Sequence, residues 1–228
     1  MGRAIEEIAL ERGHEISLRY SLEDIPENWK EQLSHSDVAI EFTAPDAAIE
    51  NIQHCFDLNV PIVVGTTGWY HLFESVAVDC RRKNQSLLYA TNFSIGVNLF
   101  FELNNQLAKL MGNFPEYAAS MEEIHHVHKK DAPSGTAITL AEGLIQNHPQ
   151  YSAWENITET NPETLSIVSI REDEVPGTHT IRYTSEIDQI EIKHIAFNRK
   201  GFAMGAVLAA EFLKGKKGVF NMNDMLKK

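Results

Sequence analysis

Val60-Pro-Ile-Val-Val-Gly-Thr-Thr-Gly68 is the stretch on which our prediction of the fold depends. Residues 60–64 form a short apolar run rich in β-branched side chains, which is typical of a strand buried on both faces in a parallel sheet. The run continues directly into Gly65-Thr-Thr-Gly68, and open α/β sheets bind ligands where a strand ends in such a turn. By itself this loop is weak evidence, because a plain strand-to-helix turn has the same composition.

The segments around this strand alternate between helix and strand patterns. Residues 37–42 and 86–90 predict two more strands, and residues 14–20 are a further candidate. Residues 1–12 predict a short amphipathic helix that ends at Gly13. Helices and strands that alternate at this spacing predict βα units and a parallel sheet, so we expect a Rossmann-like domain.

The second half of the chain has a different pattern. A long helix is predicted from about Val97 to Met111, and the strands that follow alternate apolar and polar residues, as in a mostly antiparallel open sheet with one solvated or interface face. These strands are predicted at residues 117–128, 165–171, 178–185 and 189–196. Residues 202–213 predict a helix rich in small residues that returns to the first domain. We therefore predict an α/β protein with an α+β second domain.

Composition limits the classes of function. Apolar residues make up 43% of the chain, and we expect no membrane span because no apolar run approaches about 18 residues. The net charge of −12 opposes general binding to nucleic acid or anionic membranes. Residues 1–7 carry acids and lack the apolar core of a secretory signal, while Cys55 and Cys80 are too few for a disulfide framework. We expect a cytoplasmic protein.

The residues that carry chemistry lie in the run Glu122-Glu-Ile-His-His-Val-His-Lys-Lys-Asp131. If the run continues as a strand, alternation puts His125 and Lys129 on one side and His126 and His128 on the other. An imidazole and an ammonium two pleats apart make a plausible acid and cation pair.

A helix start follows at Ala132-Pro-Ser-Gly-Thr-Ala137. Asp131 or Ser134 can cap it, and the amides of Ser134, Gly135 and Thr136 are expected to be free to hold a carboxylate. Together the two segments predict a pocket for a small, multiply anionic molecule.

Two other interpretations of these histidines were weighed. A solvated polar end of a strand would be the simplest account of His-His-Val-His-Lys-Lys in an arbitrary sequence. A metal site made by His125, His126 and His128 is the other, but alternation divides the three rings between two faces and no cysteine completes a ligand set. We expect no metal, and a metal-dependent hydrolase is the least favoured hypothesis.

The motifs together resemble the dihydrodipicolinate reductase family over nearly the whole chain. Residues 123–137 resemble its long and specific signature, and residues 65–68 and 90–98 resemble its two nicotinamide-side loops. Residues 202–206 are similar to the start of its closing helix, and residues 1–3 to the end of its glycine-rich loop.

This resemblance implies a reductase that converts 4-hydroxy-tetrahydrodipicolinate to tetrahydrodipicolinate, in diaminopimelate and lysine biosynthesis, with NADH or NADPH. It implies that His125 donates or accepts a proton and that Lys129 is a second proton donor. His126 would contact the substrate, a small dicarboxylate, and Gly135 and Thr136 would hold one of its carboxylates.

The resemblance also implies where the cofactor binds and how the chain is divided. The implied cofactor residues are Gly65, Thr66, Thr67, Ala90, Thr91, Asn92 and Phe93. Residues 1–93 and 202–228 would form the dinucleotide-binding domain, and residues 94–201 the domain for substrate binding and assembly into a homotetramer. The second predicted strand ends without an acidic residue for the adenine ribose, so the choice between NADH and NADPH stays open.

The sequence departs from the family pattern at its beginning. The strand and leading glycines that normally precede the first helix are absent from these residues. Either the sequence starts too late, or the chain has lost part of its cofactor site. An alternative hypothesis is therefore an N-terminally truncated scaffold of the same family that folds and oligomerises but is impaired in catalysis.

Overall fold

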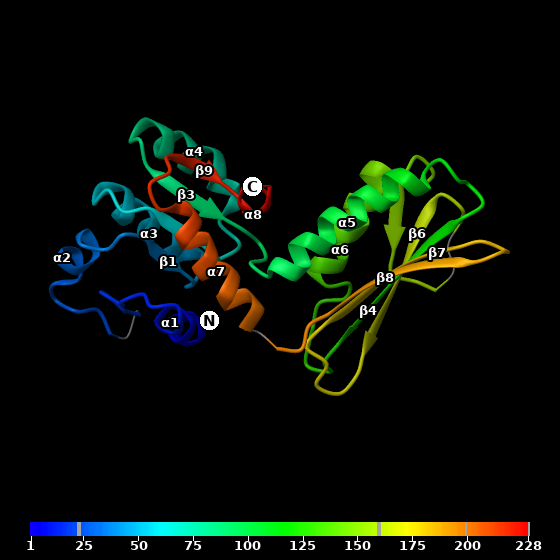
Figure 1. Ribbon diagram of the computed structural model, residues 1–228, viewed down its shortest axis with the longest axis horizontal. Helices are drawn as coiled ribbons and strands as arrows, with labels where there is room; N and C mark the ends of the chain where they lie inside the picture. Colours follow the sequence, from blue (N-terminus) through cyan, green and yellow to red (C-terminus); the bar gives the residue numbers. More distant parts are fainter. Residues whose placement is uncertain (22–23, 159–160, 199, 228) are drawn as a thin grey trace. The chain divides into compact units, whose positions relative to one another are not determined.

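The computed structural model describes residues 1–21, 24–158, 161–198 and 200–227 (Figure 1). The chain divides into two compact units. Unit 1 comprises Met1–Ile95 and Lys200–Lys228, and unit 2 comprises Gly96–Arg199.

Unit 1 is built on a parallel sheet of four strands in the order β1-β2-β3-β9. The strands are β1 (Ala39–Glu41), β2 (Ile62–Val64), β3 (Ser86–Tyr89) and β9 (Gly218–Phe220). The helices are α1 (Gly2–Glu11), α2 (Trp29–Ser34), α3 (Pro45–Asp57), the 3-10 helix η1 (Tyr70–Leu72), α4 (Phe73–Arg82), α7 (Lys200–Leu213) and α8 (Met222–Leu226). The strand β9 was not predicted from the sequence.

Helices cover both faces of this sheet. Successive side chains of a strand point to opposite faces, and apolar side chains on both faces have to be buried. Val63 and Leu88 pack with α1, α7 and α8 in one core cluster. Ile62 and Leu87, on the opposite face, pack with α3 and α4 in another. The predicted Rossmann-like arrangement is confirmed, and the apolar run at residues 60–64 is explained by burial of β2 on both sides.

Unit 2 contains a sheet of five strands in the order β5-β6-β4-β7-β8. They are β4 (Ala118–His125), β5 (Ala153–Glu155), β6 (Thr164–Arg171), β7 (Thr178–Thr184) and β8 (Gln189–Ile195). Helices α5 (Ile95–Met111) and α6 (Gly135–Asn147) pack on one face, with Met121, Ile167 and Ile181 in the core.

The sheet of unit 2 is mixed, which corrects the expectation of a mostly antiparallel one. Strand β6 pairs in parallel with both β4 and β5, whereas β7 pairs antiparallel with β4 and β8. For β4 and β6 the reason is the connection through α6, because a helical crossover returns the chain to the end of the sheet where β4 began and so makes the two strands parallel.

Two other expectations about strands were wrong. Residues 14–20 were predicted as a strand, but they carry no strand in the structure. A strand needs a hydrogen-bonding neighbour, and none of the described strands pairs with this segment. The strand predicted for residues 117–128 ends at His125, where the chain turns. None of the described helices is long and apolar enough to cross a membrane.

Candidate functional site

Four charged or polar side chains meet on the helix-covered face of the unit 2 sheet, at the end of β4. Glu123 and His125 lie two residues apart on β4 and therefore share this face. Across the sheet, Glu123 is paired in register with His179 of β7, and His125 with Arg171 of β6. Three strands distant in sequence thus build one cluster.

Glu123 is the centre of this cluster and is fully buried. Its Oε1 accepts hydrogen bonds from the Ser134 amide at 3.1 Å and from Nη2 of Arg171 at 3.0 Å. Its Oε2 lies 3.1 Å from Nδ1 of His125. Burial alone would raise the pKa of Glu123, but contacts with His125, Ser134 and Arg171 outweigh burial and hold the pKa well below its ordinary value. Glu123 is therefore a carboxylate at neutral pH.

His179 lies against the His125 ring, with 5.1 Å between the ring centroids and their planes nearly perpendicular. Burial, together with the proximity of His125, lowers the pKa of His179 to about 3. Its Nε2 is 3.2 Å from the Ser134 hydroxyl. His179 is neutral at physiological pH, so Arg171 is the cation that balances Glu123.

The residues after His125 leave the strand, so their predicted alternation between two faces was wrong. The amide of Val127 bonds to the carbonyl of Asp173, and the amide of Lys129 to that of His126, which is a turn. Nζ of Lys129 contacts both carboxylate oxygens of Asp131 at 2.9 Å.

Arg171 also forms hydrogen bonds with the backbone of this turn. Its guanidinium donates to the carbonyls of Lys129 at 3.3 Å and Asp131 at 2.5 Å. The residue thus joins the buried carboxylate of Glu123 to the segment that carries Lys129.

The start of α6 was predicted correctly in one respect and wrongly in another. Ser134 caps the helix by accepting a hydrogen bond from the Ala137 amide at 3.2 Å. Its own amide is not free, because it donates to Glu123. The amides of Gly135 and Thr136 make no hydrogen bond within the described residues, and a Cβ added at Gly135 would meet no atom within 4 Å. This end of the helix is accessible to a ligand.

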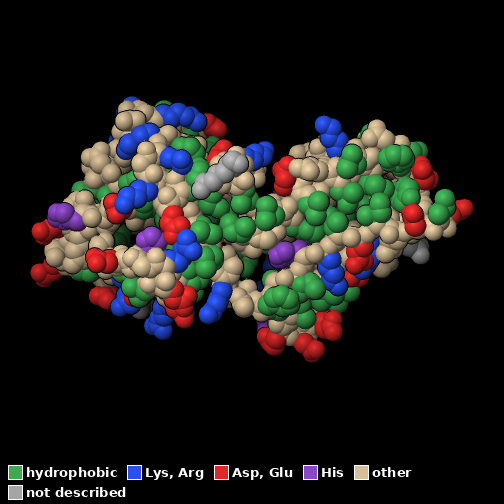
Figure 2. Space-filling model, viewed as in Figure 1, with side chains coloured by type: hydrophobic (Ala, Val, Ile, Leu, Met, Phe, Trp, Pro, Cys, Tyr) green, Lys and Arg blue, Asp and Glu red, His purple; other side chains and the backbone are tan. Residues whose placement is uncertain are grey.

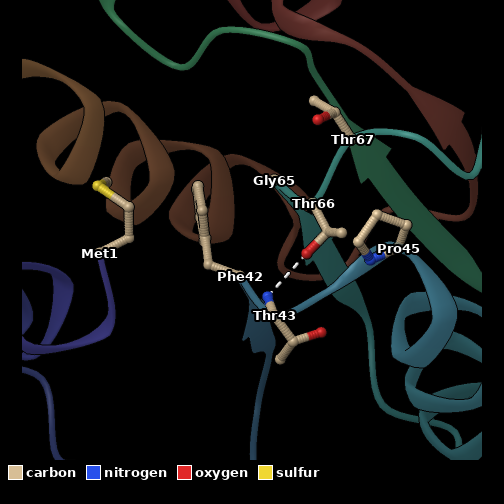
Figure 3. A pocket seen from close by; sticks show the side chains of 7 residues that line it. All are labelled: Met1, Phe42, Thr43, Pro45, Gly65, Thr66 and Thr67. Carbon is tan, nitrogen blue, oxygen red and sulfur yellow. Dashed lines mark hydrogen bonds between the residues drawn. The ribbon is translucent and has the colours of Figure 1, made fainter. Parts of the chain in front are cut away.

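Unit 1 contains a pocket of about 370 Å³ where β1 and β2 end (Figure 3). Its lining consists of Met1, Phe42, Thr43, Pro45, Gly65, Thr66 and Thr67. Figure 3 shows the hydrogen bond of 2.7 Å from the Thr43 amide to Oγ1 of Thr66, which joins the two loops. A Cβ at Gly65 would stand 2.1 Å from the Phe42 ring, so a larger residue at this position would require that ring to move.

The second predicted cofactor segment, residues 90–93, is in unit 1 but outside the lining of this pocket. Ala90 and Phe93 are buried in the core cluster with α1 and α7, while Thr91 is exposed. Oδ1 of Asn92 accepts a hydrogen bond from the Ser94 amide at 2.9 Å.

Glu41 is a residue that sequence reasoning missed, since it sought an acid only at the end of the second predicted strand. It is buried at the end of β1, and its Oε1 accepts hydrogen bonds from the Thr43 amide at 3.0 Å, from the Thr43 hydroxyl and from the Thr66 hydroxyl at 2.8 Å. Its Oε2 is buried without a hydrogen-bond partner among the described residues. Glu41 orders the two loops of the pocket.

Glu123, Arg171 and His179 were also missed as members of the site. A glutamate two residues before a histidine on one strand predicts that both lie on the same face, so Glu123 could have been found. The residues next to Arg171 and His179 in the sequence do not identify them as members of the site, because strand pairing alone brings them to Glu123.

The structure changes the set of residues that a metal could use. One ligating atom each of Glu123, His125 and His179 lie within 4.8 Å of one another, whereas His126 and His128 are outside this group. His128 instead contacts Glu174 at 3.2 Å. Arg171 forms an ion pair with Oε1 of Glu123 and so balances the charge of this buried carboxylate.

Comparison with protein families matches both halves of the chain. The model of the dihydrodipicolinate reductase N-terminus matches residues 1–93, and that of the C-terminus matches residues 96–226. A 4-hydroxy-tetrahydrodipicolinate reductase of Christiangramia forsetii is 46% identical over 226 residues, 99% of this chain and 93% of that protein. The same-named protein of Neisseria meningitidis is 31% identical, over 97% of this chain and 83% of that protein.

Among solved structures, the fold is similar to that of a dipicolinate-bound dihydrodipicolinate reductase from a Paenisporosarcina species. The TM-score is 0.75 at 22% identity, over 96% of this chain and 92% of that chain. An amine dehydrogenase from Mycobacterium smegmatis gives a TM-score of 0.54 at 12% identity, over 96% of this chain and 91% of that chain.

Proposed function

The chain belongs to the dihydrodipicolinate reductase family, and on that premise we propose that it reduces 4-hydroxy-tetrahydrodipicolinate to tetrahydrodipicolinate, with loss of water, in the lysine and diaminopimelate pathway. It is an NAD(P)H-dependent oxidoreductase. The match to the C. forsetii reductase over nearly the whole of both chains carries this proposal. The features of each unit support how the tasks are divided between them.

Unit 1 would hold the cofactor, and its pocket suits a nucleotide. The pocket lies at the carboxyl ends of parallel strands, where ligands of open α/β sheets bind, and Thr43, Thr66 and Thr67 are among the residues that line it. Together with the predicted residues Gly65 and 90–93, these side chains would bind the nicotinamide and its ribose. When bound, NADH or NADPH supplies the hydride.

Unit 2 would bind the substrate and exchange protons with it. Gly135 and Thr136 offer unpaired amides at the start of α6 for one carboxylate, and His126 would contact the substrate from the turn. His125 would donate or accept a proton beside the carboxylate of Glu123. Lys129 would supply a positive charge and a second proton, and Asp131 keeps its ammonium within the turn.

We propose assembly into a homotetramer through unit 2. Helices cover one face of its sheet, and the opposite face carries Val168, Ile170 and Ile195, of which Ile195 is 48% exposed. A second apolar surface runs along α5 with Leu99, Leu103 and Leu110 exposed, as the hydrophobic side chains in Figure 2 show. A tetramer with twofold symmetry needs two different self-complementary surfaces. Light scattering of the purified protein measures its mass and so the number of subunits.

A cytoplasmic location completes the proposal. Both cysteines, Cys55 and Cys80, are free and buried, which suits a reducing compartment.

Substitution of Lys129 tests the function directly. We expect Lys129→Ala to lower kcat by about 10²-fold or more, because general acid catalysis contributes on that order. Its affinity for NADH and NADPH should be unchanged, since Lys129 is in unit 2. Lys130→Ala is the matched control, because Lys130 is an exposed neighbour. An unaltered kcat in Lys129→Ala would show that the assignment is wrong.

A fluorescence titration distinguishes the cofactors. NADH and NADPH are each added to the chain with and without pyridine-2,6-dicarboxylate, a planar analogue of the product. Tight binding that the analogue enhances supports the proposed site and identifies the preferred nucleotide. No binding of either nucleotide contradicts a functional cofactor site in these residues.

A further inference from the structure

Glu123 lies beside His125, the proposed acid or base, within unit 2. Nδ1 of His125 and Oε2 of Glu123 are 3.1 Å apart. Both atoms are buried, and neither makes a hydrogen bond with any described residue; at this distance only the orientation of the ring keeps them from pairing with each other. Each is therefore the available partner of the other, and a buried polar atom that stays unpaired is costly.

The carboxylate cannot turn away from the ring, because its other oxygen is held twice. Oε1 accepts from the Ser134 amide and from Arg171, at 3.1 Å and 3.0 Å. Ser134 is fixed in turn as the cap of α6, and Arg171 is anchored on the carbonyls of the turn that follows β4. Oε2 is thus presented to His125 by a rigid frame.

The opposite side of the His125 ring faces Gly177. A Cβ added at Gly177 would stand 3.0 Å from Nε2 of His125, and the residue has φ +154°, which side-chain-bearing residues rarely adopt. A side chain there would cover Nε2. The glycine keeps this nitrogen uncovered, while the carboxylate of Glu123 lies beside the other nitrogen.

The carboxylate of Glu123 lies closer to His125 than to His179. Its Nε2 is 3.9 Å from Oε2 of Glu123, and its closer contact is with the Ser134 hydroxyl at 3.2 Å. The ring packs edge-on against His125 and limits its rotation.

We propose that Glu123 is a positioning residue that keeps the proton of neutral His125 on Nδ1 and so leaves Nε2 as the atom that exchanges protons with the substrate. The proposal rests on the assignment of His125 as proton donor or acceptor. A neutral imidazole has one donor and one acceptor nitrogen, and the partner of the first nitrogen determines which one is the acceptor.

The substitution Glu123→Gln makes a specific prediction about the ring. Glutamine keeps the volume, and its single amide oxygen should stay with its two donors, the Ser134 amide and Arg171. Its NH₂ group then faces Nδ1 of His125 and donates to it, so the ring proton moves to Nε2. We expect kcat to fall by about 10²-fold or more, with cofactor affinity unchanged.

The decisive measurement is the ¹⁵N spectrum of the ring nitrogens, recorded with labelled histidine at a pH where imidazoles are neutral. The His125 signals are identified by their loss in His125→Asn. In the unmodified chain we expect a protonated Nδ1, and in Glu123→Gln a protonated Nε2. Glu122→Gln is the matched control, because Glu122 lies on the opposite face of β4 and pairs with Arg182.

Each outcome decides the proposal. A protonated Nε2 in the unmodified chain overturns it without any variant, so poor folding of Glu123→Gln would not leave it untested. A reversed tautomer in Glu123→Gln with unchanged kcat also overturns it. If the unmodified chain does not reduce the substrate, the proposed function fails, but the ¹⁵N spectrum still shows whether Glu123 sets the tautomer.

Discussion

Gly205→Ala should destabilise unit 1, because α7 packs directly on the backbone of the loop at Phe93. Gly205 is buried, and a Cβ built on it stands 1.7 Å from the carbonyl oxygen of Phe93 and 2.8 Å from its carbonyl carbon. Ordinary contacts begin near 3.4 Å, so the helix and the loop must separate by more than an ångström. A backbone carbonyl cannot rotate out of the way as a side chain can.

The expected size of the effect follows from two opposing contributions. Overpacking of a core costs about 1–3 kcal/mol, and contact with backbone places this site at the upper end. Alanine is more favourable than glycine inside a helix by about 1 kcal/mol, which offsets part of the cost. The net loss in the free energy of unfolding is about 2 kcal/mol, equivalent to a fall in Tm of roughly 8 °C.

Gly201→Ala on the same helix is the matched control. Its Cβ would meet only Oγ of Ser94, at 3.6 Å, and the position is exposed. Helix propensity then acts alone and should stabilise the protein by up to about 1 kcal/mol.

Thermal and urea unfolding followed by tryptophan fluorescence measure the difference between the two variants. In a Trp154→Phe background the remaining tryptophans, Trp29 and Trp69, both report on unit 1. A Gly205→Ala chain that unfolds at or above the temperature of the unmodified protein would refute the close approach of α7 to the loop.

Two further predictions concern one buried group in each unit. Glu41→Gln should weaken NADH binding by about tenfold. A neutral amide oxygen accepts the hydrogen bonds that order the two loops more weakly than the carboxylate does, and hydrogen bonds to charged groups are worth about 1.5–3 kcal/mol. Fluorescence titration tests this, with exposed Glu50→Gln as the control, and equal affinities would contradict the role given to Glu41. Burial lowers the pKa of His179 to about 3 in the folded chain. Between pH 6.5 and pH 3 the unfolded chain therefore binds a proton at this residue that the folded chain does not bind, so the free energy of unfolding falls as the pH falls. The urea midpoint of unit 2 should be lower at pH 5 than at pH 7. The difference should be smaller in His179→Gln than in the unmodified protein. The same pH dependence in both proteins would contradict the lowered pKa of His179.

The amino-acid sequence by itself determined the local features of this protein. The apolar run at residues 60–64 identified a doubly buried strand, Gly13 ended the first helix, and Ser134 capped α6, because each of these depends on near neighbours in the chain. The motif around His125 was long enough to indicate the family. It also placed Glu123 and His125 on one face, although that consequence was not drawn.

Only the tertiary structure decided which distant residues meet. Strand order brings Arg171 and His179 to Glu123, and the crossover through α6 makes the second sheet mixed. The turn after His125 removed Lys129 from the predicted alternation, because pairing with β6 and β7 ends there. Periodicity describes how a segment presents its side chains, but partner strands and loop closures are set by packing between segments far apart in sequence, which no local pattern encodes.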